Sequence, residues 1–255
     1  MNTEREHEIT RAFVSIANSM ADGADVVDLL SGLTSDCARL LDIASAGLLL
    51  ADGHGVLHVL AASSERTRDL EIFQLQRDEG PCLDCFRSGQ QVSVNDLTLE
   101  TKRWPQFVAA ATTAGFAAVH ALPMRLRGTT LGALNLFGDK AGALEADDLD
   151  LAQALAHVAS IALVTDKAAS DKDILNQQLQ TALVSRIAIE QAKGVLAQLG
   201  SLDMDQAFAV LRRYARDHNA RLSEVAQQLV SRELAAQQLL DHSMSWLNPG
   251  TRSKG

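Results

Sequence analysis

The sequence RIAIEQAKGVLAQLGSLDMDQAFAVLRRYARDHNARLSEVAQQLV runs from residue 186 to residue 230 and decides the fold of the last third of the chain. Its apolar residues recur every three or four positions, the spacing that places side chains on one face of a helix. Breaks are expected after Gly200 and near Asn219, where turn-forming residues interrupt the pattern. The stretch therefore predicts an all-α domain of three helices.

Charge also separates this region from the rest of the chain. Residues 186–255 hold nine Lys or Arg and seven Asp or Glu, a net charge of +2, within a chain whose total is −9. A chain this acidic is not expected to bind nucleic acid over its whole surface, but a local basic face can still bind a phosphate backbone.

Cations recur along all three expected helices. Arg186 and Lys193 are two helical turns apart and share a face, although Glu190 is placed to pair with Arg186. A glycine at position 194 destabilises a helix by about 1 kcal/mol relative to alanine. Close approach of another helix or of a phosphate backbone would explain its presence. The candidate contacts are Arg186, Lys193, Gly194, Arg212, Arg213, Arg216 and Arg221. The alternative is a solvated helix face without a ligand.

These residues carry a family resemblance. The segment resembles the ANTAR family of RNA-binding antitermination domains. Besides Arg186, the resemblance rests on Ile189, the run 191–194, Leu196 and positions 207–208, 211–212, 215, 222 and 225–226. The resemblance implies that three helices bind stem-loop RNA and favour transcription through a terminator. It implies that Arg186, Lys193 and Arg212 contact that RNA, and it supports the same role less for Arg213 and Arg216.

The preceding 140 residues predict a different class of domain. Two apolar runs flank residues 52–55 as a β-hairpin, and two more strands are expected to meet near Gly128. Helices are expected over 65–76, after Pro81 and over 104–114, with a strand near residue 92. This order favours an α+β domain with a mostly antiparallel central sheet.

This region resembles a GAF domain. The resemblance rests on residues 79–82, Gly89, residues 104–105, residues 121–123 and the run 131–136. It implies a small-molecule ligand, but a fold that binds many ligands identifies neither a particular one nor a cofactor. His120, on an expected strand, either faces such a pocket or is a satisfied polar group.

Cys82 and Cys85 form a CxxC pair at an expected helix start, where the helix dipole can lower a thiol pKa. A redox signal through a Cys82–Cys85 disulfide is one interpretation, and a buried structural loop is the other. Tetrahedral zinc needs four ligands, and Cys37 is the only further cysteine, so no metal is expected.

Few helix breakers occur between Asp147 and Leu199. Ile161, Ala168, Leu175, Ala182 and Ile189 recur every seven residues, which favours a coiled-coil homodimer; one helix packed on its own domain is the alternative. The expected layout is an N-terminal helix (1–24), a GAF sensor domain (25–165), a connecting helix (166–185), an ANTAR domain (186–240) and a disordered tail (241–255).

The chain shows neither a signal peptide nor a membrane span, so a cytoplasmic protein without membrane contact is expected. The sequence thus predicts a non-enzymatic regulator whose GAF domain senses a small-molecule or redox signal and whose ANTAR domain binds stem-loop RNA. Two alternatives remain open. One is a thiol-dependent reductase that uses Cys82 and Cys85, and the other is a protein-interaction module that never touches RNA.

Overall fold

The computed structural model describes residues 3–21, 25–163 and 172–247. It contains two compact units, Met1–Ala182 and Leu183–Gly255, and the boundary between them falls within one helix, α7. None of the helices described is both long enough and apolar enough to cross a lipid bilayer.

The N-terminal unit is built on a five-stranded antiparallel sheet with the strand order β2-β1-β5-β4-β3. This confirms the predicted α+β class, the hairpin around residues 52–55 and the strand pair around Gly128. The strands are β1 (Ser45–Ala51), β2 (Leu57–Ala62), β3 (Val92–Val94), β4 (Ala118–Leu126) and β5 (Thr129–Gly138).

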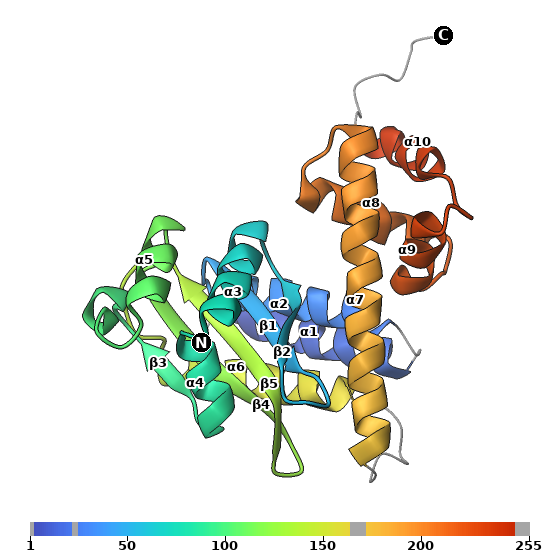
Figure 1. Cartoon of the computed structure of the whole chain (residues 1–255). Coiled ribbons are helices and arrows are strands. Elements are labelled where there is room, and N and C mark those ends of the chain that lie inside the picture. The colour runs from blue at the N-terminus through green and yellow to red at the C-terminus, as the bar shows by residue number, and fades with distance from the viewer. Residues whose placement is uncertain (1–2, 22–24, 164–171, 248–255) are drawn as a thin grey trace. The chain divides into compact units, whose positions relative to one another are not determined.

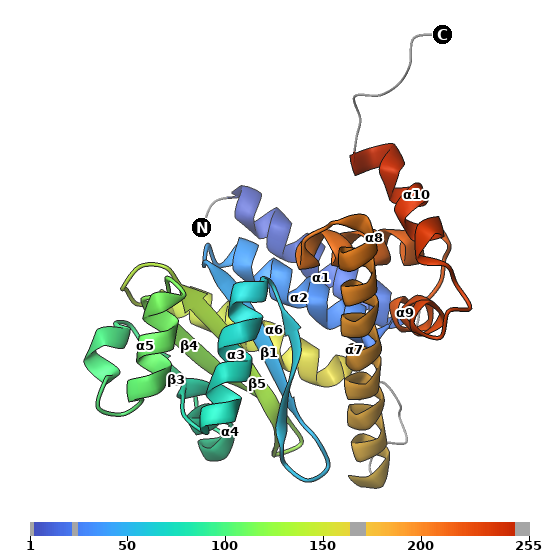
Figure 2. The same cartoon turned by 45° about the horizontal axis from the view of Figure 1, so that its top comes forward.

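Helices cover both faces of this sheet (Figures 1 and 2). One face carries α2 (Val26–Leu40) and α6 (Ala146–Ala162), and α1 (Thr3–Ala21) packs on α2. The other face carries α3 (Glu65–Arg77), α4 (Pro81–Ser88) and α5 (Pro105–Thr113), with the short 3-10 helix η1 (Leu97–Glu100) before α5. Both faces are buried, which explains the nearly continuous apolar runs of β1, β4 and β5.

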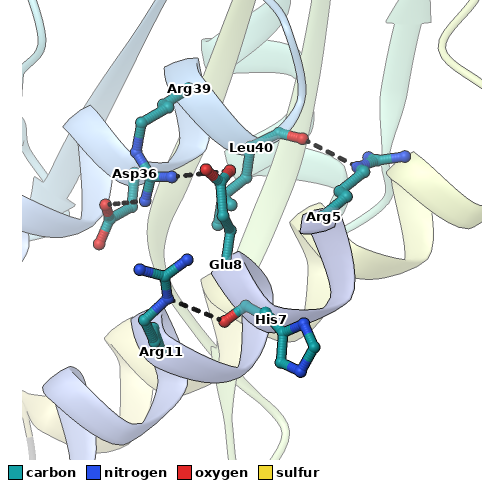
Figure 3. Close-up of polar contacts among 7 residues, drawn as sticks. All are labelled: Arg5, His7, Glu8, Arg11, Asp36, Arg39 and Leu40. Atoms are coloured by element: carbon teal, nitrogen blue, oxygen red, sulfur yellow. Dashed lines mark hydrogen bonds and ion pairs between the residues drawn. The ribbon is translucent and has the colours of Figure 1, made fainter. Parts of the chain in front are cut away.

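Polar contacts hold α1 against α2 (Figure 3). The Arg39 guanidinium pairs with Glu8 of α1 at 3.0 Å and with Asp36 of its own helix at 2.9 Å. Arg5 Nε donates to the carbonyl oxygen of Leu40 at 3.2 Å. Ion pairs this exposed stabilise the folded chain by less than about 1 kcal/mol each. Their main effect is therefore on the relative position of the two helices, not on stability.

The limits of α4 follow from its sequence as predicted. Pro81 occupies the first turn, where its missing N–H has no intrahelical partner to lose. The helix ends at Gly89, which adopts the left-handed conformation at φ 64° and donates its N–H to Cys85 O. This short helix places both Cys82 and Cys85 in the interior.

The C-terminal unit is all-α, as predicted, and contains the end of α7 (Lys172–Gly200), α8 (Met204–Asp217), α9 (Leu222–Val230) and α10 (Ala236–Leu247). A capping box between Asp203 and Gln206 starts α8. Leu222, Val225, Ala226 and Leu229 form the buried face of α9, as their spacing predicts.

Two predictions about chain continuity need correction. The tail predicted to be disordered from residue 241 is helical to residue 247, because Leu239, Leu240 and Ser243 bury one face of α10. Residues 248–255 of that tail lie outside the described residues. The stretch from Asp147 to Leu199 is not one continuous helix, because α6 ends at Ala162, and α7 is described from Lys172. Ala168 and residues 166–171 of the expected connecting helix lie outside the described part.

Candidate RNA-binding surface and sensor interior

Two of the predicted RNA contacts, Arg186 and Lys193, lie in a buried charge cluster on α7. Arg186 Nη2 lies 2.5 Å from Glu190 Oε1, and Lys193 Nζ lies 3.3 Å from each Glu190 oxygen. Arg186 is 8% exposed and Lys193 is 3% exposed. The spacing of Arg186 and Glu190 predicted their pairing, but it did not predict that Arg186 and Lys193 would be buried. Both cations already have a counter-charge in the structure.

This cluster also connects α7 to α8. Lys193 Nζ lies 5.7 Å from the centroid of the Phe208 ring, within the range of a cation–π contact. A desolvated cation is costly to leave without its anion, so Glu190 and Phe208 hold Lys193 at the helix contact. The arrangement supports a positioning role for Lys193 in the packing of α7 on α8.

The surroundings of Gly194 differ from the close helix approach that would justify a glycine at this position. No heavy atom lies within 4 Å of the position a Cβ would take, and the residue is exposed. Within the described chain, therefore, no close helix approach explains this glycine. Its exposed side of α7 also carries Ile187 and Val184, which are 58% and 60% exposed.

The remaining predicted cations differ in exposure. Arg212 is half-buried, whereas Arg213 and Arg216 on α8 and Arg221 at the start of α9 are exposed. Arg213 Nε lies 3.0 Å from Asp217 Oδ2. We call Arg213, Arg216 and Arg221 the α8–α9 basic surface. They are the predicted RNA contacts whose charges are exposed to solvent.

An aromatic cluster beside this surface was missed by the sequence analysis. Tyr214 and His218 stack with ring centroids 3.9 Å apart, and His242 lies edge-on to both. His242 Nε2 also lies 2.9 Å from Asp217 Oδ2, which connects α10 to α8. The spacing of four residues between Tyr214 and His218 signals a helical pair, but His242 fell in the segment predicted to be disordered.

The interior of the N-terminal unit holds a polar cluster that the sequence analysis also missed. Glu71 on α3 is completely buried, and Asn135 Nδ2 on β5 donates to its Oε1 at 2.6 Å. Gln74 Nε2 donates to the other carboxyl oxygen. Burial raises the Glu71 pKa to about 8, although both hydrogen bonds oppose the shift. Glu71 is therefore mostly protonated at neutral pH.

The two cysteines of the CxxC pair border this interior. Cys82 and Cys85 are fully buried and free. Burial raises the pKa of the Cys85 thiol to about 12, and burial together with the Glu71 charge raises that of Cys82 well above its usual range. The helix start does not offset this desolvation. Buried, protonated thiols are poor nucleophiles, so burial lowers the reactivity of both cysteines, and a redox role for the pair stays a prediction. No group of three or more potential metal ligands occurs in the described part of the chain.

The architecture is that of an α+β domain with an all-α domain after it, and comparison with family models identifies both. The chain belongs to the GAF domain family through residues 23–164, and an ANTAR domain matches residues 177–230. No curated protein matches the chain.

The chain is also similar to solved structures. The chain is similar to the GAF domain of a phosphoenolpyruvate-protein phosphotransferase from Acinetobacter, with 12% identity and a TM-score of 0.52 over 67% of this chain and 99% of that one. It also matches a GAF domain region of a membrane protein from Geobacter sulfurreducens, with 22% identity and a TM-score of 0.48 over 60% and 99% of the two chains. At such identities, the first likeness shows the fold alone.

Proposed function

We propose that this chain is an RNA-binding antitermination regulator of the cytoplasm, without enzymatic activity, whose GAF domain senses a small-molecule signal. The observation that carries the proposal is the ANTAR match over residues 177–230 together with exposed cations on two of its helices. Stem-loop RNA is the partner expected for an ANTAR domain. Binding of the ANTAR domain to that RNA would favour transcription through a terminator.

Within this proposal the predicted site residues take two roles. The α8–α9 basic surface contacts the phosphate backbone, because its guanidinium groups are exposed to solvent. Arg186 and Lys193 act from inside the domain by fixing α7 through Glu190. Arg212, which is half-buried, belongs to the proposed RNA-binding set, whereas the exposed Gly194 is better explained by the chain pairing proposed below.

Replacing Arg213, Arg216 and Arg221 together by glutamine should weaken RNA binding without changing the melting temperature. The plot of log K against log salt has a negative slope. Each lost phosphate contact is expected to reduce the magnitude of that slope by about 0.7 to 0.9. Filter binding of stem-loop RNA across a salt series measures both the affinity and that slope.

A matched control replaces Arg77, Arg87 and Arg125, three exposed cations of the GAF domain, by glutamine. It makes the same change in net charge at residues that are not part of the proposed surface. Equal salt slopes for the wild-type chain and the Arg213, Arg216 and Arg221 variant would remove these residues from the site. RNA binding no stronger than that of an unrelated acidic protein would favour the protein-interaction alternative.

We further propose that two chains pair through α7. On α7 the described residues of the predicted seam, Ala182 and Ile189, are buried in their own chain, whereas Ile161 on α6 is 48% exposed. A different stripe, Val184, Ile187, Gln191 and Gly194, is exposed and has the alternating spacing of three and four residues found in coiled coils. Gly194 would then allow close approach of the second α7.

Ile187→Glu should convert the dimer into a monomer, because it places two like charges in the centre of the proposed seam. Sedimentation equilibrium of the full chain measures the change. Leu99→Glu is the control, since Leu99 is 77% exposed on η1 and outside the seam. A wild-type chain that sediments as a monomer at all concentrations would contradict the pairing.

A further inference from the structure

A cavity of about 390 Å³ lies at one end of the sheet. Its walls come from the connection between α2 and β1, from β4 and from the connection between β5 and α6. Residues that line it include Asp42, His120, Asp139, Lys140 and Leu144. Its volume is within the range of pockets that hold small molecules.

This cavity lies on the opposite side of the sheet from Glu71. Ala121 pairs with Asn135 across β4 and β5, and Asn135 contacts Glu71 on the face covered by α3. His120 pairs with Leu136, one residue along each strand. Because successive side chains of a strand point to opposite faces, His120 points to the face covered by α2 and α6.

His120 is a buried polar side chain among the residues that line this cavity. It is 3% exposed, and its Nδ1 is buried without a hydrogen-bond partner in the described part of the chain. Burial lowers the His120 pKa, which keeps the ring neutral at neutral pH, with one nitrogen as donor and the other as acceptor. An unsatisfied buried polar atom costs about 1 to 3 kcal/mol, so a ligand group that satisfies it is favoured.

The rim of the cavity is charged. Asp42, Asp139 and Lys140 are exposed, and among the residues described none of the three has an ion-pair partner. Two carboxylates and one ammonium therefore remain available to a ligand. A molecule with both an ammonium and a carboxylate group complements these charges, whereas a simple anion or a simple cation satisfies only part of them.

We propose that this cavity binds a small zwitterion of the free amino-acid type. The ligand ammonium pairs with Asp42 and Asp139, the ligand carboxylate pairs with Lys140, and a polar group of the ligand hydrogen-bonds to His120. This proposal rests on the small-molecule sensing proposed above, and the site shares no residue with the Glu71 interior or the ANTAR surface, so it stands whether or not the chain binds RNA.

Isothermal titration of the full chain with each of the twenty common amino acids, without RNA, tests the proposal. We expect one or a few to bind at one molecule per chain, while ethylamine and acetate at the same concentration do not. Lys140→Ala and Asp139→Asn should each weaken that binding at least tenfold. Lys102→Ala, an exposed lysine distant in sequence from the cavity residues, should leave it unchanged.

Substitution of His120 would also disturb the packing of β4, so its role is followed in the wild-type chain. Nitrogen NMR of labelled histidine should show a shift of the His120 ring signals on saturation, and Lys140→Ala should abolish the shift at the same ligand concentration. The proposal is overturned if no amino acid binds, or if binding survives both rim substitutions. Binding that is lost in Glu71→Gln but kept in Lys140→Ala would place the ligand on the other face and also overturn it.

Discussion

Gly132→Ala is expected to destabilise the GAF domain by about 3 kcal/mol or more, the range of severe overpacking in a core. A Cβ at position 132 would lie 2.0 Å from the carbonyl oxygen of Leu49, in the adjacent strand β1. A backbone atom in a paired strand cannot move aside as a flexible side chain can. The ladder between β1 and β5 must therefore open or shift at this point.

Urea unfolding of the variant, followed by circular dichroism, measures this loss. Gly142→Ala is the matched control, because a Cβ there meets nothing within 4 Å and the backbone is not in the left-handed region. The control should unfold at the wild-type urea concentration. If Gly132→Ala does the same, the close approach of β1 and β5 at this position is wrong.

Glu71→Gln should remove most of the pH dependence of stability between pH 5 and pH 9. The Glu71 pKa is raised from 4.5 to about 8, so the folded chain holds a proton that the unfolded chain releases. Its contribution is fully present below pH 4.5 and is lost as the pH rises through 8. For one group the loss between pH 5 and pH 9 is about 4 kcal/mol, and glutamine does not titrate.

The wild type and the variant should therefore have similar free energies of unfolding at pH 5, where the wild-type carboxyl is neutral. At pH 9 the variant should be more stable, because the wild-type chain then buries a charge. Urea midpoints at each pH unit supply the comparison, and the difference between the two chains cancels other titrating groups such as His120. Parallel pH profiles would show that Glu71 is ionised in the folded state at all these pH values.

Local signals predicted much of the fold. Pro81 and Gly89 mark the ends of α4, and the turn residues around positions 52–55 mark a hairpin, because both depend on backbone conformations that few residues adopt. The end of α6 at Ala162 and the extent of α10 were not predicted. Each depends on which apolar residues find a partner, and sequence periodicity does not reveal this.

The candidate site divides in the same way. Residue types and spacing indicated cations on the C-terminal helices and a possible pairing of Arg186 with Glu190. They could not show that Lys193 is buried beside Phe208 while Arg216 stays exposed, since this depends on how α8 packs against α7. The Glu71–Asn135 contact joins residues 64 positions apart, a distance at which no local pattern operates.

By itself the sequence determined the two domain classes, the order of their elements and the family resemblance, because these rest on local propensity, hydrophobic period and motif. Only the tertiary structure decided which charges are exposed, which carboxyl is protonated and where a cavity remains. Those properties depend on desolvation and contact between residues distant in the chain. Glu71, Lys193 and His120 differ from exposed residues of the same types through their surroundings in the fold.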